Sequence, residues 1–166
     1  MDKKSKSPAK ALTIFKSKEK KVFITNSANE TRTLGTFFAA LLKKGDIVFF
    51  TGDLGSGKTT FIQGIIGNFV QKKYIRSSSF TIASEYEAAD FKLFHLDLYR
   101  LAPSNIADIG IDDYLYSNNV ALIEWAQRLK GSDNEATWIV ESKYIDDNKR
   151  EIVIRCSRDY TRLSLS

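Results

Sequence analysis

The segment Gly52–Thr59, with the sequence GDLGSGKT, matches the phosphate-binding loop pattern G-x-x-x-x-G-K-[ST] at every fixed position. Glycines in such a loop let successive backbone N–H groups turn toward phosphate oxygens. The ammonium of Lys58 has the length to reach the β- and γ-phosphates, and the hydroxyl of Thr59 can bind Mg²⁺. We therefore expect this segment to bind a nucleoside triphosphate together with magnesium.

A phosphate-binding loop needs a carboxylate at the end of a neighbouring strand to complete the magnesium shell. Glu124 follows the apolar run Val120–Ile123, and Asp97 follows the more polar stretch Phe91–Leu96. One of these acids can bind the metal while the other orients the attacking water or holds a metal-bound water. The more apolar run before Glu124 favours Glu124 as the metal ligand and Asp97 as the residue that assists hydrolysis.

The surrounding pattern predicts the elements that position these residues. Expected strands lie at 22–25, 46–51, 81–87, 91–98, 120–123, 137–144 and 151–157, and expected helices lie at 30–45, 60–69 and 108–116. Ser27 or Asn29 can cap the first helix, and Gly45 is expected to end it. This order predicts an α/β fold, a P-loop NTPase-like three-layer sandwich whose sheet is mostly parallel with antiparallel additions.

Length and composition are those of one globular domain. The chain has 166 residues, 43% of them hydrophobic, and a single cysteine, which excludes an internal disulfide and suits a reducing cytoplasm. Residues 1–21 hold eight lysines and two acids, a net charge of +6, while the whole chain carries +5, so residues 22–166 have a net charge of −1. We expect a disordered basic tail over residues 1–21 and one domain over residues 22–166. No apolar run approaches the roughly 20 residues that a membrane span requires.

Two further features carry weaker signals. His95 is the only histidine, so no histidine-based triad or metal cluster can form, and both a structural and a supporting role in the site stay open. Asn148-Lys149-Arg150-Glu151 partly matches the guanine-reading motif N-K-x-D, but Glu151 replaces the aspartate. We therefore disfavour a GTPase.

Three segments together resemble the TsaE (YjeE) family. They are the loop GDLGSGKTTF at 52–61, HLDLYR at 95–100 and IEW at 123–125, in the family's order and spacing. Glu30-Thr31 and Leu34-Gly35 are similar to its N-terminal helix signature, and the likeness runs from about residue 25 to 156. One departure is Ser77-Ser78-Ser79-Phe80, where the family usually carries S-P-T-[FY]. Without the proline this loop should be more mobile.

The resemblance implies a small bacterial ATPase required for threonylcarbamoylation of adenosine next to the anticodon in tRNAs that read ANN codons. TsaE proteins work with TsaD and TsaB, which carry the transfer chemistry, and hydrolysis of ATP resets that complex. For this chain it implies ATP and Mg²⁺ as cofactors, TsaD- and TsaB-like partners, contact with tRNA only through the complex, no membrane and a cytoplasmic location.

The resemblance also implies site residues. Thr59 and Glu124 would bind the metal, and Lys58 and Asp97 would be catalytic. The residues expected to contact ATP are Thr31, Asp53, Leu54, Gly55, Ser56, Gly57, Lys58, Thr59, Thr60, Trp125, Lys149 and Arg150. Two other functions remain as alternatives: a small-molecule or nucleotide kinase, and a non-hydrolytic module whose nucleotide state gates assembly with other proteins.

Overall fold

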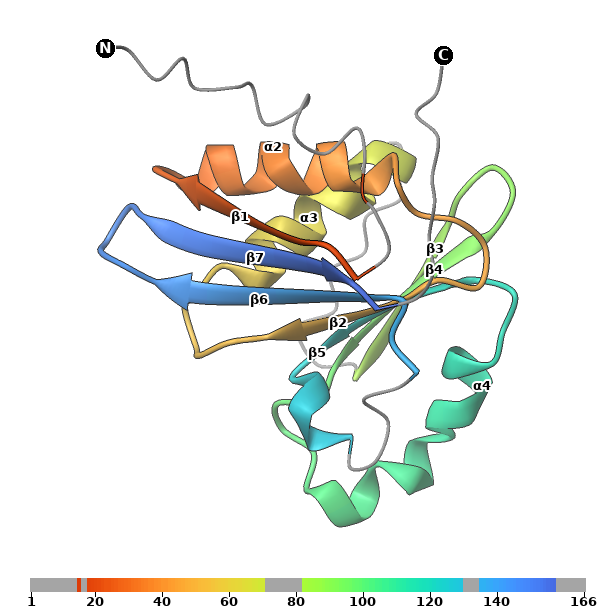
Figure 1. Cartoon of the computed structure of the whole chain (residues 1–166). Helices are drawn as coiled ribbons and strands as arrows, with labels where there is room; N and C mark the ends of the chain where they lie inside the picture. Colours follow the sequence, from red (N-terminus) through yellow and green to blue (C-terminus); the bar gives the residue numbers. More distant parts are fainter. Residues whose placement is uncertain (1–14, 16–17, 71–81, 130–134, 158–166) are drawn as a thin grey trace, which may run out of the picture.

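The computed structural model describes residues 15, 18–70, 82–129 and 135–157, which form a seven-stranded sheet in the order β1-β7-β6-β2-β5-β4-β3 (Figure 1). The strands are β1 (Lys20–Thr25), β2 (Ile47–Thr51), β3 (Ala83–Glu87), β4 (Lys92–Asp97), β5 (Val120–Glu124), β6 (Trp138–Tyr144) and β7 (Arg150–Cys156). The α-helices are α2 (Ala28–Ala39), α3 (Lys58–Phe69) and α4 (Ile111–Leu115). Short 3-10 turns are η2 (Pro103–Asn105), η3 (Ala107–Ile109) and η4 (Ala126–Arg128).

The sheet has a parallel centre and antiparallel edges. Strand β2 pairs in parallel with both β6 and β5, and β5 pairs in parallel with β4. Strand β3 then adds antiparallel to β4 on one side, while β7 and β1 add antiparallel beyond β6 on the other. The predicted α/β fold with antiparallel additions is confirmed. Because the four central strands are parallel, the carboxyl ends of β2, β4 and β5 lie side by side at the same end of the sheet.

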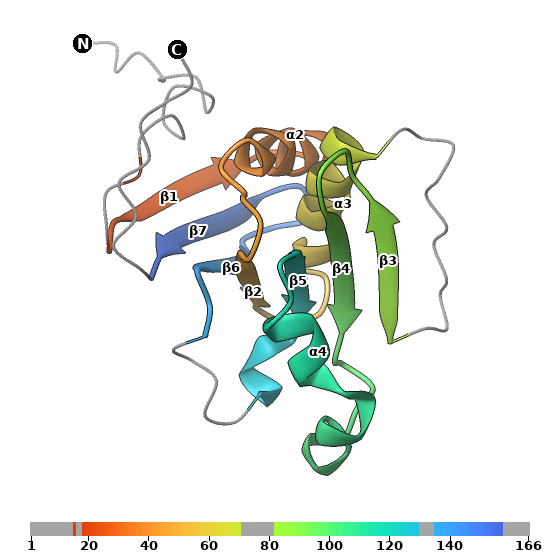
Figure 2. The same ribbon diagram turned by 90° about the vertical axis from the view of Figure 1, so that its right-hand side faces the viewer.

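Helices cover both faces of the sheet, as the two views show (Figures 1 and 2). On one face α2 and α3 pack over a cluster that contains Phe38, Ile62 and Trp138. On the other face Ile111 of α4 contributes to a second cluster with Ile123 of β5. All five residues of β5 are buried, as expected for a strand covered on both sides. Within the described ranges, no helix has the length and apolar character needed to cross a lipid bilayer.

Helix α2 begins as the sequence predicts but ends earlier. The Ser27 hydroxyl accepts a hydrogen bond from the Glu30 amide at 3.1 Å, which identifies Ser27 as the N-cap. The helix ends at Ala39, not at Gly45 as expected from the apolar stripe. Its last turn tightens, since the Leu41 amide bonds the Phe38 carbonyl three residues back. Gly45 instead forms the turn before β2, with φ of +81°.

Helices α2 and α3 approach closely through Gly64. A Cβ atom on Gly64 would lie only 1.9 Å from the backbone oxygen of Arg32, so no larger residue fits there. The Thr36 hydroxyl donates to the Gly64 carbonyl at 3.2 Å across the same contact. This close packing fixes the start of α2 relative to the helix that follows the phosphate-binding loop.

The predicted tail over residues 1–21 needs a correction at its end. Lys20 and Lys21 belong to β1, and the side chain of Phe15 is 1% exposed. The Phe15 ring lies 5.2 Å from the Trp138 ring in an edge-to-face contact, and Lys21 Nζ lies 4.5 Å above the Phe15 ring. The high lysine content of the segment led to the prediction of a disordered tail, although its Phe15 belongs to the core. Residues 1–14 and 16–17 lie outside the described part of the chain.

The helix predicted at 108–116 is shorter than expected. Residues 107–109 form a 3-10 turn, and Gly110 with φ of +66° separates it from α4. The loop at 77–80, where a serine stands in place of the family's proline, lies outside the described residues. The remaining predicted strands agree with the structure to within about two residues.

Replacing Phe15 by alanine tests the correction to the tail. We expect Phe15→Ala to lower the free energy of unfolding by about 3 kcal/mol, since it removes a buried ring and leaves a cavity beside Trp138. Urea denaturation followed by circular dichroism gives the value. Tyr116→Ala is the control, because Tyr116 is 68% exposed and its loss should cost less than about 0.5 kcal/mol. Equal stability of the two variants would show that Phe15 does not pack on the fold.

Candidate functional site

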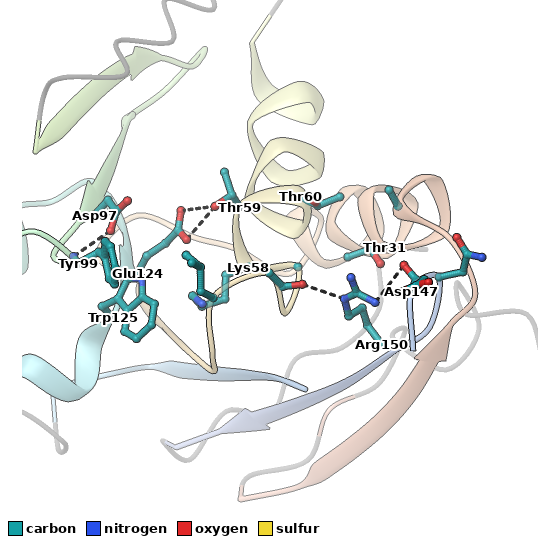
Figure 3. Close-up of a pocket in the computed structure, with 15 residues that line it drawn as sticks. Thr31, Lys58, Thr59, Thr60, Asp97, Tyr99, Glu124, Trp125, Asp147 and Arg150 are labelled. Carbon is teal, nitrogen blue, oxygen red and sulfur yellow. Dashed lines mark hydrogen bonds between the residues drawn. The ribbon is translucent and has the colours of Figure 1, made fainter. Parts of the chain in front are cut away.

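A pocket of about 290 Å³ lies where β2, β4 and β5 end, between the phosphate-binding loop, the start of α2 and the β6–β7 turn (Figure 3). This is the edge of a parallel sheet at which α/β proteins commonly bind ligands. The residues that line it are Ala28, Thr31, Leu54, Gly55, Gly57, Lys58, Thr59, Thr60, Asp97, Tyr99, Glu124, Trp125, Asp147, Asn148 and Arg150.

The N-terminus of α3 points its first amides into this pocket. The helix begins at Lys58, directly after Gly57, whose φ of +100° is a conformation that glycine adopts readily and other residues rarely do. Among the described residues no side chain caps this helix end, and its first turn contains no acid. A helix N-terminus of this kind favours binding of an anion such as phosphate.

Lys58 lies folded back on its own loop. Its side-chain ammonium donates to the backbone oxygens of Gly52 at 2.7 Å and Asp53 at 2.8 Å, and the residue is 4% exposed. Burial lowers the pKa of Lys58 below its usual value, although the negative charges of Glu124, Asp97 and Asp53 act in the opposite direction. The ammonium therefore lies in the pocket wall, where two backbone carbonyl oxygens accept its hydrogen bonds.

Glu124 is a buried carboxylate at the end of β5, 3% exposed. The Thr59 hydroxyl lies 2.9 Å from its Oε2 and 3.1 Å from its Oε1. His95 Nε2 lies 2.9 Å from the same Oε1 (Figure 3 shows the bonds from Thr59). The pairing that the sequence suggested, a loop threonine with a strand-end acid, is therefore present in the structure.

A hydroxyl and one carboxylate fit a magnesium ion, which prefers oxygen ligands and keeps several waters or phosphate oxygens in its shell. In the described part of the chain, no group of three or more His, Cys, Asp or Glu side chains could hold a metal ion by itself. A magnesium ion at Thr59 and Glu124 would therefore need phosphate and water to complete its coordination.

Asp97 lies opposite Glu124 in the β4–β5 pairing, and its side chain also lines the pocket. Its Oδ1 accepts a hydrogen bond from the Tyr99 amide at 3.0 Å, which orients the carboxylate at the strand end. Unlike Glu124, Asp97 is exposed, and no hydrogen bond joins it to Thr59 among those of the described residues. The two acids thus occupy neighbouring positions with different environments.

Trp125 forms the wall of the pocket next to Lys58. Its φ of +59° is unusual for a bulky residue and marks a strained backbone position directly after Glu124. Lys58 Nζ lies 4.4 Å above the indole ring, and the Tyr99 ring lies 4.9 Å from it. The ammonium and the indole are close enough for a cation–π contact.

Arg150 ties the phosphate-binding loop to the β6–β7 turn. Its Nε donates to the Gly55 carbonyl at 3.0 Å, and one terminal nitrogen donates to the carbonyls of Asp146 at 2.6 Å and Lys149 at 2.8 Å. The guanidinium also lies 4.7 Å from the centre of the Tyr144 ring. One side chain thus connects segments 95 residues apart in the sequence.

The structure brings most of the predicted site residues together. Those that line the pocket are Thr31, Leu54, Gly55, Gly57, Lys58, Thr59, Thr60, Asp97, Glu124, Trp125 and Arg150. Three predicted residues do not line it. Asp53 contacts Lys58 through its carbonyl, Ser56 within the loop is fully buried, and the side chain of Lys149 is exposed outside the pocket.

Four lining residues were not predicted: Ala28, Tyr99, Asp147 and Asn148. Asn148 is the first residue of the partial N-K-x-D match, and Asp147 directly precedes it in the same polar turn. Tyr99 lay within the family motif HLDLYR, whose aspartate alone was assigned a role. Nothing in the sequence distinguished Ala28.

Comparisons with known proteins identify relatives of the chain. The sequence profile of the family described as "Threonylcarbamoyl adenosine biosynthesis protein TsaE" matches residues 25–152. The protein named tRNA threonylcarbamoyladenosine biosynthesis protein TsaE from Rickettsia bellii is 40% identical over 76% of this chain and 89% of its own length. Those of the same name from Bacillus subtilis and Treponema pallidum are 34% and 33% identical, over 77% and 79% of this chain and 80% and 97% of their own.

A solved structure shares the architecture. The crystal structure of YdiB from Bacillus subtilis superposes with a TM-score of 0.67 and 29% sequence identity. The match covers 86% of this chain and 89% of that one. The similarity therefore extends over the sheet and the helices on both of its faces.

The contact between Lys58 and Trp125 predicts a fluorescence signal. ATP with Mg²⁺ should draw the ammonium away from the indole, so the emission of Trp125 should change on binding. Trp138 is fully buried between Phe15 and Phe38 and should report little. Titrating ATP into Trp138→Phe should reproduce the wild-type response, whereas Trp125→Phe should lose it. A signal carried by Trp138 alone would contradict this geometry.

Proposed function

The chain belongs to the TsaE family, and on that premise we propose that it binds and hydrolyses ATP in the biosynthesis of threonylcarbamoyladenosine in tRNA. The observation that carries the proposal is the group formed by Lys58, Thr59 and Glu124. These residues place an ammonium, a hydroxyl and a buried carboxylate around the free N-terminus of α3. An ammonium, a magnesium-binding pair and unbonded helix amides are what a triphosphate requires.

The residues divide the work of phosphoryl transfer to water. Amides of the loop and of the first turn of α3 hold the phosphate oxygens, and Lys58 exchanges its carbonyl partners for the β- and γ-phosphates. Thr59 and Glu124 would hold Mg²⁺, which would supply positive charge against the developing charge on the phosphates. Asp97, exposed at the strand end, accepts a hydrogen bond from the attacking water and orients it.

The nucleoside belongs at the other end of the pocket. Ala28 and Thr31 at the start of α2, together with Asp147 and Asn148 in the β6–β7 turn, line that end. Gly57 lies between the two ends, and a Cβ atom there would contact both Arg150 and Thr31 at 3.6 Å. We propose ATP as the nucleotide, which rests on the resemblance to TsaE proteins and on the polar turn available to a base.

We further propose that the chain acts with TsaD- and TsaB-like proteins in the cytoplasm and meets tRNA only through that complex. The support is family membership together with the relatives' shared name, which assigns them to this tRNA modification. A pull-down with the host's TsaD and TsaB homologues, with and without ATP, tests the partnership. If neither protein is captured, with or without ATP, the proposed partnership is wrong.

Lys58→Ala tests the ATPase assignment. The backbone cradle and the helix N-terminus survive the change, so we expect ATP binding to weaken only about tenfold while hydrolysis falls at least about a hundredfold. The measurement is single-turnover hydrolysis at high protein concentration, beside ATP affinity by calorimetry. Lys149→Ala is the matched control, because that lysine lies outside the pocket and its loss should leave both values unchanged. Wild-type hydrolysis by Lys58→Ala would overturn the assignment.

The same assay separates the proposal from the alternatives. Transfer of the γ-phosphate to a small molecule in preference to water would indicate a kinase. Tight ATP binding without turnover, even with the partner proteins present, would indicate a nucleotide-sensing module. Release of inorganic phosphate in single-turnover conditions supports the ATPase.

Two carboxylate variants test the division of roles at the strand ends. Glu124→Gln keeps the size of the side chain but provides an uncharged amide, a poor magnesium ligand, so we expect the Mg²⁺ needed for ATP binding to rise about tenfold or more. Asp97→Asn should leave Mg²⁺-dependent binding intact and lower single-turnover hydrolysis about a hundredfold. ATP affinity across a Mg²⁺ series, beside hydrolysis rates, gives both results. The reverse pattern would exchange the two roles.

A further inference from the structure

His95 lies on the same face of the sheet as the proposed metal ligand. In β4, Leu93 faces the cluster beneath α2 and α3, and alternation along the strand places His95 and Asp97 on that side too. In β5 the corresponding residues are Leu122 and Glu124. The imidazole, the carboxylate and the Thr59 hydroxyl therefore meet beneath the first turn of α3.

The geometry of the contact restricts what His95 does. Its Nε2 lies 2.9 Å from Glu124 Oε1, and the two side chains are 16% and 3% exposed. A carboxylate that binds a metal is ionised and only accepts hydrogen bonds, so Nε2 must carry the proton that is donated. This bond holds Oε1, while Thr59 Oγ1 lies 2.9 Å from Oε2 and 3.1 Å from Oε1. Two donors, one from His95 and one from Thr59, therefore hold the carboxylate in place.

We propose that His95 is a positioning residue that orients the Glu124 carboxylate toward Thr59 and so prepares the magnesium site before nucleotide binds. The inference rests on the proposed function. Without this donor, the buried carboxylate would keep only Thr59, whose hydroxyl is itself a proposed metal ligand. The carboxylate could then rotate about its terminal bond, since that torsion has a broad energy minimum. Metal binding would then have to order the carboxylate, which would lower the affinity for the metal.

A purely structural histidine would behave differently. Its loss would lower stability and weaken ATP binding whether or not magnesium is present. A histidine that positions Glu124 affects only the part of nucleotide affinity that depends on magnesium. Loss of an outer partner of this kind typically costs 10- to 100-fold in metal affinity or activity.

Two substitutions separate these roles. His95→Phe keeps a ring of similar size and removes the donor. His95→Gln supplies a neutral amide N–H near the position of Nε2 and so restores a donor. Lys92→Gln is the control on the same strand, because the Lys92 side chain is exposed and its ion pairs with Glu85 and Glu87 lie on the surface.

The experiment measures ATP affinity by calorimetry over a Mg²⁺ series and again in EDTA, with the thermal midpoint of each protein. We expect His95→Phe to raise the half-saturating Mg²⁺ about tenfold, with ATP affinity in EDTA unchanged, and His95→Gln to recover most of the loss. Lys92→Gln should match the wild type throughout.

Three results would overturn the inference. They are an unchanged Mg²⁺ requirement in His95→Phe, an equal loss of affinity in EDTA, and a His95→Gln variant no better than His95→Phe. If the wild type binds Mg²⁺ and ATP normally, each of these rejects the role of His95 alone. A wild type that binds no ATP at any Mg²⁺ concentration rejects the proposed function itself.

Discussion

The site depends on keeping one carboxylate out of water. Glu124 is 3% exposed at the end of a strand covered on both faces, and a buried charge is tolerated only when donors surround it. Thr59 and His95 provide those donors. Their bonds join the first turn of α3 to the ends of β4 and β5, so the group that would bind the metal also connects the elements that surround it.

The other half of the pocket is connected by different means. Arg150 joins the β6–β7 turn to the phosphate-binding loop through Gly55. Close packing at Gly64 holds α2, and with it Thr31, against the helix that begins in the pocket. Thr31 is itself fixed by a buried hydrogen bond of 2.7 Å to the hydroxyl of Thr25 in β1. These contacts attach the start of α2 and the β6–β7 turn to the rest of the pocket.

Features that depend on a few neighbouring residues could be predicted from the sequence. The loop at 52–59 followed by a helix, the buried strand before Glu124 and a cap at Ser27 or Asn29 have physical signatures within a few residues. The structure has the loop and helix, the buried strand and the cap at Ser27. Long-range packing was not predictable in the same way. Phe15 stands among lysines and gives no periodic signal, yet it packs against Trp138, which is distant in sequence. Asn148 reaches the pocket only because β6 and β7 form a hairpin beside the loop, and Lys149 next to it does not.

The contacts of Lys58 with its own loop would compete with any anion that enters the pocket. The ammonium is held by two carbonyl oxygens and the indole of Trp125, so any incoming anion has to replace these contacts before it gains from the charge. On the proposed function, a ligand with one phosphate at the helix end would recover little of that loss, whereas a chain of phosphates would reach the displaced ammonium as well. The loop would then favour a longer polyphosphate over a single phosphate.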